Sequence, residues 1–171
     1  MKIVEFFLTL FLRIMSLLPQ RVQFLIGRIV GLILFKFLDE RREIAHWNIK
    51  KCFPEKDLKE IDFILKENFK RLGESIFEFL NSFWASDKKL KKLIKNFDEV
   101  KKVADNLDPK KGKLILVLHT PNTDMVVRAS SLFLKVSGMA KVQSIRVLEN
   151  ILTASRKKFV ERIFRPNEGS D

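Results

Sequence analysis

The stretch KLILVLHTPNTDMVVRAS, residues 113–130, marks the point where the character of the chain changes. It begins with the apolar run 113–118, which ends at His119, and Asp124 follows five residues later. A short apolar run bounded by turns is typical of a strand that is buried on both faces of a parallel sheet. The run therefore predicts a strand with His119 at its carboxyl end, where open sheets place reactive groups.

The sequence after residue 123 continues this pattern. Helical periodicity over 124–138 ends at a glycine, 141–147 is a second strand-like run, and helical periodicity returns over 151–164. This β-α-β-α order predicts parallel strands joined by a right-handed crossover. The expected fold class is α/β, in which a helical, membrane-associated N-terminal part precedes an incomplete parallel-type sheet with crossover helices.

The first 38 residues are the most apolar part of the chain, yet charges interrupt every window of about 18 residues, the length that a membrane span requires. Pro19 divides this segment into two predicted helices. The interrupting cations recur roughly every two helical turns, which places them on one side of a helix; they are Arg13, Arg21, Arg28 and Lys36. Such basic amphipathic helices are typical of proteins that lie in the membrane interface, and an ordinary pair of core helices is the alternative.

The middle of the chain keeps helical spacing of three and four residues, without an internal repeat or a linker. His46 lies there on a charged helix with no acidic residue at a suitable spacing, so we interpret it as structural. We expect a single domain over residues 1–171. Its expected parts are membrane-interface helices at 1–38, a helical part at 39–111 and the β-α-β-α part at 112–171.

Composition limits the classes of partner. The chain has 171 residues and a formal net charge of +12, which indicates anionic partners such as a membrane surface or phosphorylated molecules. It has 16 Phe and no Tyr, and most of the Phe lie inside apolar runs, which argues against base stacking and hence against nucleic-acid binding. A single cysteine excludes a disulfide framework and a cysteine-rich metal site, and fits a protein that faces the cytosol.

His119 and Asp124 can meet only in one arrangement. If both were helical, they would lie about 140° apart around the axis, so the histidine must precede the helix. Thr120 can act as N-cap and Pro121 suits the first helical position, which puts Asp124 in the first turn. The aspartate could then orient the imidazole as a general base, with no covalent enzyme intermediate; a capping aspartate beside a structural histidine remains the alternative.

Four blocks of the sequence, in order and over most of the chain, resemble the late acyltransferases of lipid A biosynthesis, the lauroyl and myristoyl transferases of Gram-negative bacteria. The blocks are LLPQRVQFLIGRIVGLILF at 17–35, RREIAHWNIKKCFPE at 41–55, NFKRLGESIFEFLNSFWAS at 68–86 and GKLILVLHTPNTD at 112–124. The H-x4-D/E motif of that family falls on His119 and Asp124. Its further site residues fall on Asn122, on Arg146 and Asn150 in SIRVLEN, and on Arg156 in SRKKF.

The resemblance implies transfer of a fatty acyl group from acyl carrier protein to a hydroxyl of a phosphorylated lipid A precursor, at the cytoplasmic face of the bacterial inner membrane. His119 would be the base, Asp124 its orienter, and the remaining four residues would bind substrate, with no metal and no cofactor besides the thioester. The chain departs from the family at Leu118, where a glycine is usual, and at 145–147, where Tyr-Arg-Pro is usual.

Two alternative functions remain open besides nucleic-acid binding. A glycerolipid acyltransferase of the lysophosphatidate type shares H-x4-D, and an inactive membrane-bound remnant would carry the motif without using it. Family members continue well beyond the length of this chain, so we expect a C-terminally truncated member that lacks part of the fold, exposes a sheet edge and has little activity alone.

Overall fold

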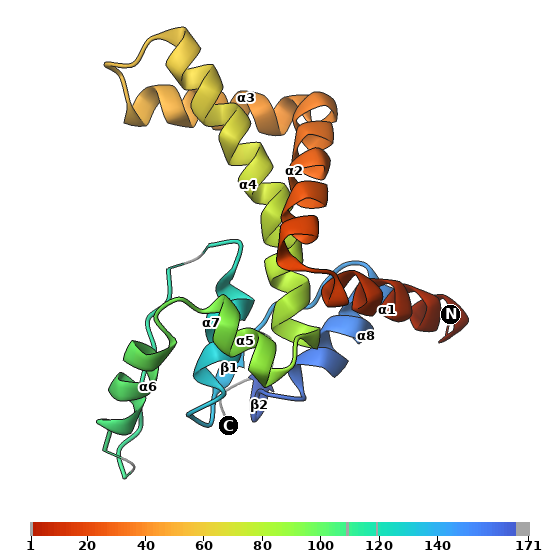
Figure 1. Cartoon of the computed structure of the whole chain (residues 1–171), viewed down its shortest axis with the longest axis vertical. Helices are drawn as coiled ribbons and strands as arrows, with labels where there is room; N and C mark the ends of the chain where they lie inside the picture. Colours follow the sequence, from red (N-terminus) through yellow and green to blue (C-terminus); the bar gives the residue numbers. More distant parts are fainter. Residues whose placement is uncertain (1, 109, 119, 167–171) are drawn as a thin grey trace. The chain divides into compact units, whose positions relative to one another are not determined.

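The computed structural model describes residues 2–108, 110–118 and 120–166, so the predicted base His119 lies outside the described residues. The described part is mostly helical (Figure 1). Its elements are α1 (Lys2–Leu17), α2 (Gln20–Phe37), α3 (Asp39–Cys52), α4 (Leu58–Trp84), α5 (Asp87–Leu93), α6 (Phe97–Asp105), α7 (Thr123–Ser130), β1 (Ser137–Met139), α8 (Arg146–Arg156) and β2 (Arg162–Phe164).

The chain forms two compact units. One comprises residues 18–78, and the other combines residues 1–17 with residues 79–171. Helix α4 begins in the first unit and ends in the second. The prediction of a single domain is not tested by this division and stays a prediction.

In the unit of residues 18–78, α2 packs against α4 through glycine. A Cβ atom on Gly27 would lie 2.8 Å from the carbonyl oxygen of Gly73 and from the Cα atom of Glu74, and one on Gly73 would collide with the carbonyl oxygen of Gly27. Only a residue without a side chain permits two helix backbones to come this close. The glycines at these positions therefore set the distance between α2 and α4.

Ion pairs flank this glycine contact. Arg28 of α2 lies 3.5 Å from Glu67 and 3.4 Å from Glu74, both on α4. Arg28 is thus directed at protein carboxylates, whereas the sequence pattern placed it with the cations of a membrane-facing helix. The apolar side chains of Leu25 and Ile29 are exposed on α2.

The other unit contains α1, α8 and the short sheet. Glu5 of α1 accepts a hydrogen bond from the Asn150 amide of α8 at 2.8 Å. Ser16, near the end of α1, is buried, and its carbonyl oxygen accepts from the Lys89 ammonium of α5 at 2.5 Å. Polar groups of α1 therefore face protein.

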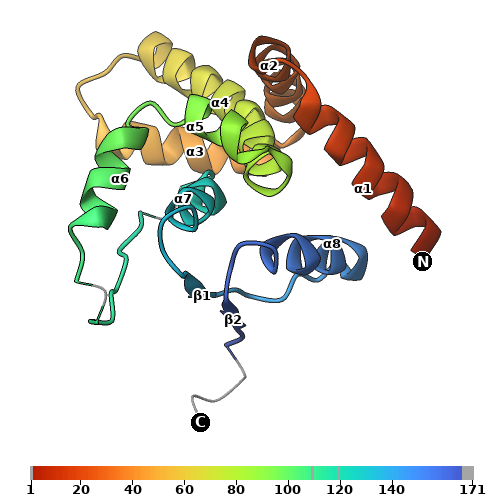
Figure 2. The ribbon, with the colours of Figure 1, turned by 60° about the horizontal axis from the view of Figure 1, so that its bottom comes forward.

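Strands β1 and β2 pair in parallel, and α8 connects them. The register aligns Ser137 with Arg162 and Met139 with Phe164. Figure 2 shows α7 and α8 above this strand pair. A parallel pair joined through a helix was predicted, and this coarse part of the α/β prediction is confirmed.

The strand predicted at 113–118 is wrong for the described structure, because these residues have no regular secondary structure and form no ladder. Exposure alternates along them, from 89% at Leu116 to 37% at Val117, as expected of extended chain with one side half covered. A segment becomes a strand only where a neighbouring strand exchanges backbone hydrogen bonds with it. Within the described ranges, no strand pairs with residues 113–118.

The boundaries predicted after residue 123 also need correction. The predicted helix 124–138 stops at Ser130, and its last residues form β1 instead. The predicted strand 141–147 is irregular chain that leads into α8, and the predicted helix 151–164 ends at Arg156, before β2. Strands of three residues have too little periodicity to be recognised, and only the pairing of β1 with β2 reveals them.

The helical N-terminal part was predicted correctly. Pro19 precedes α2 and separates it from α1, and α3 ends directly before Phe53 and Pro54. Across the described chain, none of the helices alone has the length and hydropathy to cross a membrane, although α1 and α2 would meet that test as a broken pair.

Candidate active site

The site is built around the start of α7. A compact turn precedes this helix, because the Thr123 hydroxyl donates to the Thr120 carbonyl oxygen at 2.7 Å and accepts from the Thr120 N–H at 3.2 Å. Asn122 occupies the N-cap position, without a side-chain capping bond. The predicted cap at Thr120 and first helical position at Pro121 are therefore wrong, since the Thr120–Thr123 turn occupies that segment. Asp124 still lies in the first turn of α7, as predicted.

Asp124 has a fixed partner in Arg156. The arginine Nε and Nη2 atoms donate to Oδ1 and Oδ2 of the carboxylate, both at 3.0 Å, which is the two-pronged geometry of the strongest charge-assisted pairs. The side chains are only 21% and 16% exposed, and the guanidinium also lies 5.8 Å from the centroid of the Phe83 ring. The orientation of the Asp124 carboxylate is therefore set from the last turn of α8.

The two charges of the pair are also stabilised by the dipoles of the helices that carry them. Asp124 sits near the positive end of the α7 dipole, and Arg156 near the negative end of the α8 dipole. Each charge is favoured by its own helix as well as by its partner. Two bonds from arginine leave lone pairs on both carboxylate oxygens, so Asp124 can accept a further hydrogen bond.

A cavity of about 370 Å³ holds the pair. Its walls come from α7, from β1 and the chain after it, and from the end of α8. They include Thr123, Val127, Gly138, Lys141, Gln143 and Val160. The position of His119, five residues before Asp124, lies outside the described residues, so its distance to the carboxylate stays a prediction.

The other predicted substrate-binding residues are not gathered around Asp124. Arg146 is the first residue of α8 and Arg156 the last, so the two are separated by about 15 Å along the helix axis. Asn150 is engaged with Glu5, and the Asn122 side-chain oxygen accepts from the Thr120 hydroxyl at 2.6 Å. Only Arg156 of these four is brought directly to the predicted orienter.

Sequence reasoning missed a second, partly buried ion pair close to this cavity. The Glu149 carboxylate, on α8, accepts from Arg165 Nη2 at 2.5 Å, from the Thr153 hydroxyl at 2.6 Å and from the Gln143 N–H at 2.9 Å. Burial alone would raise the pKa of Glu149, but the bonds from Gln143, Thr153 and Arg165 outweigh it and lower that pKa below its usual 4.5. The Arg165 guanidinium also donates to the Ala140 carbonyl oxygen at 3.1 Å. This cluster links the chain before α8, at Ala140 and Gln143, to Arg165 after α8. From the sequence alone, only the contact between Glu149 and Thr153 could have been predicted, because these two residues are four apart on one helix.

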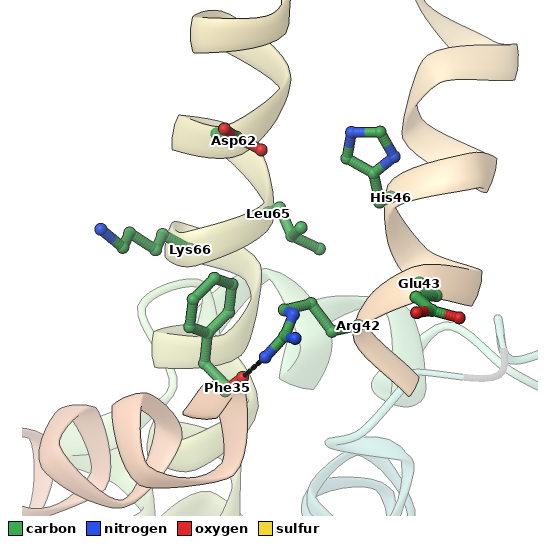
Figure 3. Close-up of a pocket in the computed structure, with 7 residues that line it drawn as sticks. All are labelled: Phe35, Arg42, Glu43, His46, Asp62, Leu65 and Lys66. Carbon is green, nitrogen blue, oxygen red and sulfur yellow. Dashed lines mark hydrogen bonds between the residues drawn. The ribbon is translucent and has the colours of Figure 1, made fainter. Parts of the chain in front are cut away.

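His46 lines a separate cavity of about 350 Å³ between α3 and α4 (Figure 3). Arg42 donates to the Phe35 carbonyl oxygen at 2.7 Å there, and its guanidinium lies 5.3 Å from the Phe35 ring centroid. Asp62 of α4 lines the same cavity, although no sequence spacing linked it to His46. Glu43, three residues before His46 on α3, also lines this cavity, and the interpretation of His46 as structural stays a prediction.

The described residues contain no group of three or more histidine, cysteine or acidic side chains that could hold a metal ion.

Comparison with known proteins identifies relatives. The family model for the bacterial lipid A biosynthesis acyltransferases matches residues 1–169. A lipid A biosynthesis palmitoleoyltransferase of Escherichia coli and a lipid A biosynthesis acyltransferase of Shigella flexneri are each 22% identical to this chain over 143 residues, which is 82% of this chain and 46% of each relative. The chain thus spans about half the length of these relatives. No solved structure matches it.

The family model covers nearly every residue, including the turn before α7, Asp124 and Arg156. The chain belongs to the bacterial lipid A biosynthesis acyltransferase family.

Proposed function

We propose that this chain takes part in transferring a fatty acyl group from an acyl carrier protein thioester to a hydroxyl of a phosphorylated lipid A precursor. Family membership supports the reaction class. The observation that carries the site assignment is the two-pronged Arg156–Asp124 pair at the start of α7, the helix that begins four residues after the position of His119.

In the proposed reaction, His119 removes the proton of the acceptor hydroxyl while the hydroxyl oxygen bonds to the thioester carbonyl carbon. The carbon–sulfur bond then breaks, and the proton passes from the imidazolium to the leaving thiolate. Asp124 selects the tautomer of the imidazole and stabilises its charged form. This reaction requires no metal ion and no cofactor besides the acyl thioester.

The contacts of the two arginines support different proposed tasks for them. Arg156 holds Asp124 and is therefore a positioning residue, rather than a free cation for the substrate. Arg146 is exposed at the far end of α8, where it can contact a phosphate of the lipid acceptor. Asn122 lies beside Asp124 and remains a candidate for substrate contact, whereas Asn150 connects α8 to α1.

We also propose that α1 lies in an anionic membrane surface, at the cytoplasmic face of the bacterial inner membrane. Its polarity is inverted relative to a core helix, because Glu5 and Ser16 face protein while Phe7 and Phe11 are 63% and 55% exposed. An outward-facing apolar helix surface gains free energy only if something apolar covers it. Membrane lipid would cover it, and the net charge of +12 favours anionic lipid.

The reaction is tested with purified protein in anionic vesicles, supplied with acyl carrier protein thioester and either a lipid A precursor or lysophosphatidate. We expect slow acylation of the lipid A precursor, in keeping with the little activity predicted for the chain alone, and replacement of His119 by Ala lowers that rate at least about 100-fold, the contribution of a positioned base. Acylation of lysophosphatidate alone would indicate the glycerolipid class. A His119→Ala variant as active as the natural protein would refute the proposed base.

A further inference from the structure

The cavity between α3 and α4 gathers charges of both signs. Its volume is about 350 Å³, and all of its lining residues belong to the unit of residues 18–78. Two cations and two carboxylates line it, from both helices: Arg42, Glu43, Asp62 and Lys66 (Figure 3). Phe35 and Leu65 supply an apolar part of the wall. The positive and negative formal charges of the lining therefore cancel.

Most of these charged groups are not satisfied by one another. Asp62 and Lys66 are four residues apart on α4, with the acid first, which is the favourable order for a helical ion pair. Lys56 and Glu60 form such a pair at 3.0 Å even in the less favourable order. In the part of the chain that the structure describes, however, the side chains of Glu43, Asp62 and Lys66 make no hydrogen bond or ion pair. Their charges remain available to a ligand.

The two cations lie at the same end of the cavity. The Arg42 guanidinium and the Lys66 ammonium lie 5.3 and 6.0 Å from the centroid of the Phe35 ring. Arg42 is fixed by donating to the Phe35 carbonyl oxygen at 2.7 Å and to Asp39 at 2.6 Å. A guanidinium has five N–H groups, so further donors of Arg42 remain for an anion. A fixed guanidinium beside an ammonium is suited to bind a phosphate.

An acceptor end lies one helical turn further along both helices. His46 follows Arg42 by four residues on α3, and Asp62 precedes Lys66 by four residues on α4. Figure 3 shows His46 and Asp62 on facing helices, on the side of the cavity away from Phe35. A carboxylate accepts hydrogen bonds, as does one nitrogen of a neutral imidazole. One turn, about 5.4 Å, therefore separates a donor end of the cavity from an acceptor end.

We propose that this cavity binds a zwitterionic group in which two methylenes join a phosphate to a primary ammonium, the chemistry of phosphoethanolamine. The phosphate accepts from Arg42 and Lys66, and the ammonium donates to Asp62 and His46. A ligand with a charge of one sign meets like charges in the same cavity, whereas a zwitterion meets opposite charges at both of its ends. His46 thereby has a binding role in place of the structural one predicted for it.

The surroundings favour a phospholipid headgroup over a free metabolite. Trp47 follows Glu43 by four residues on α3, and Phe63 precedes Lys66 by three on α4, so each lies on the helix face beside the cavity. These two aromatic side chains are 59% and 67% exposed. The volume is at the lower limit of the range of about 300–1,000 Å³ that small-molecule sites occupy, which suits a headgroup without its acyl chains. The acyl chains then lie against the exposed aromatic side chains outside.

The charge pattern is tested by calorimetric titration of the full chain with phosphoethanolamine, phosphocholine, inorganic phosphate and ethanolamine. We expect phosphoethanolamine to bind at least about tenfold more tightly than phosphate or ethanolamine, because each of these keeps only one charged end. Phosphocholine should bind about tenfold more weakly than phosphoethanolamine, because its quaternary ammonium has no hydrogen to donate. Equal affinities for phosphoethanolamine and inorganic phosphate would overturn the proposal.

Two single substitutions test the two ends separately. Asp62→Asn should lower the affinity for phosphoethanolamine to that for phosphate, and Lys66→Gln should lower the affinity for both. Both side chains are exposed, so neither change disturbs a core. Glu40→Gln and Arg41→Gln are the matched controls, because they make the same changes in charge on exposed residues of α3 that do not line the cavity. Equal losses in the controls would show attraction by net charge alone and overturn the site.

The source of the ligand is tested with vesicles of phosphatidylethanolamine and phosphatidylglycerol, against matched vesicles in which phosphatidylcholine replaces the phosphatidylethanolamine. The natural chain and Glu40→Gln should sediment preferentially with the phosphatidylethanolamine vesicles, and Asp62→Asn should lose this preference. A preference that survives Asp62→Asn would overturn the site. Binding of free phosphoethanolamine without any vesicle preference would overturn the phospholipid as its source. None of these measurements involves acyl transfer, so their failure leaves the proposed function standing.

Discussion

At the scale of single residues, Asp124 is held from a position 32 residues further along the chain. The H-x4-D spacing predicted that Asp124 lies in the first turn of a helix, and the structure places it there. The spacing could not predict Arg156 as its partner, because nothing local links the two and only the return of α8 brings them together. The resemblance singled out Arg156 for substrate binding, which stays a prediction, and its contacts with Asp124 support the positioning role that we propose.

Replacing Arg156 by Gln should lower the rate of the reaction through Asp124. The Asp124 carboxylate would lose the two hydrogen bonds that fix its orientation. We expect kcat/KM to fall about 10- to 100-fold through misplacement of the carboxylate.

The matched control is Arg128→Gln. Arg128 also lies over an aromatic ring, that of Phe159 at 5.4 Å, but its ion-pair partner is the exposed Asp87 rather than Asp124. Its replacement should leave kcat/KM unchanged. An Arg156→Gln variant that keeps the kcat/KM of the natural protein would contradict the positioning role.

Glu149 predicts an acid-dependent loss of stability. Because its pKa is lowered in the folded chain, it contributes stability that is fully present above its unfolded value of 4.5 and is lost as the pH falls through the folded value. Glu149→Gln should lower the free energy of unfolding by about 1–3 kcal/mol at pH 7, and by less near pH 3, in urea titrations at both values. The exposed Glu161→Gln should have little effect at either pH. An equal loss at both pH values for Glu149→Gln would contradict this account.

At the scale of elements, helices were predictable and strands were not. The three- and four-residue spacing of apolar side chains identified the helices of residues 39–106, because that spacing is a property of each segment alone. The run 113–118 has the composition of a strand but no hydrogen-bonding neighbour within the described part of the chain, whereas β1 reads Ser-Gly-Met and pairs. Pairing between distant segments decides strands, and a single sequence does not contain that information.

The contact between α2 and α4 predicts strong position dependence among the glycines. Gly73→Ala would drive a methyl group into the backbone of α2 at Gly27, so we expect the free energy of unfolding to fall by about 1–3 kcal/mol or more. Gly112→Ala is the control, because a Cβ there meets no atom within 4 Å. Chemical denaturation followed by circular dichroism measures both. Equal stabilities of the two variants would show that α2 and α4 do not pack through Gly73.

At the scale of the whole molecule, net charge and apolar segments predict an anionic membrane surface as partner, and the exposed apolar side chains of α1 are where we propose that lipid binds. Phe7→Ser with Phe11→Ser should lower partitioning onto anionic vesicles at least tenfold, since a buried aromatic side chain is worth about 1.5–3 kcal/mol. Val142→Ser, on another exposed apolar residue, is the control. Vesicle sedimentation measures the partitioning. Unchanged partitioning of the double variant would mean that α1 does not contact lipid.

Because the Asp124–Arg156 pair is mostly buried, its stability should depend little on ionic strength. Salt screens exposed charges over about 8 Å at physiological concentration and about 3 Å at 1 M, but an ion pair at 3.0 Å with little exposed surface is largely shielded from the counterions. Attraction between surface lysines and anionic lipid has no such protection. If α1 lies in an anionic membrane surface as proposed, a concentrated salt wash should weaken that attachment while the pair at the start of α7 persists, so that lipid binding and site integrity can be studied apart.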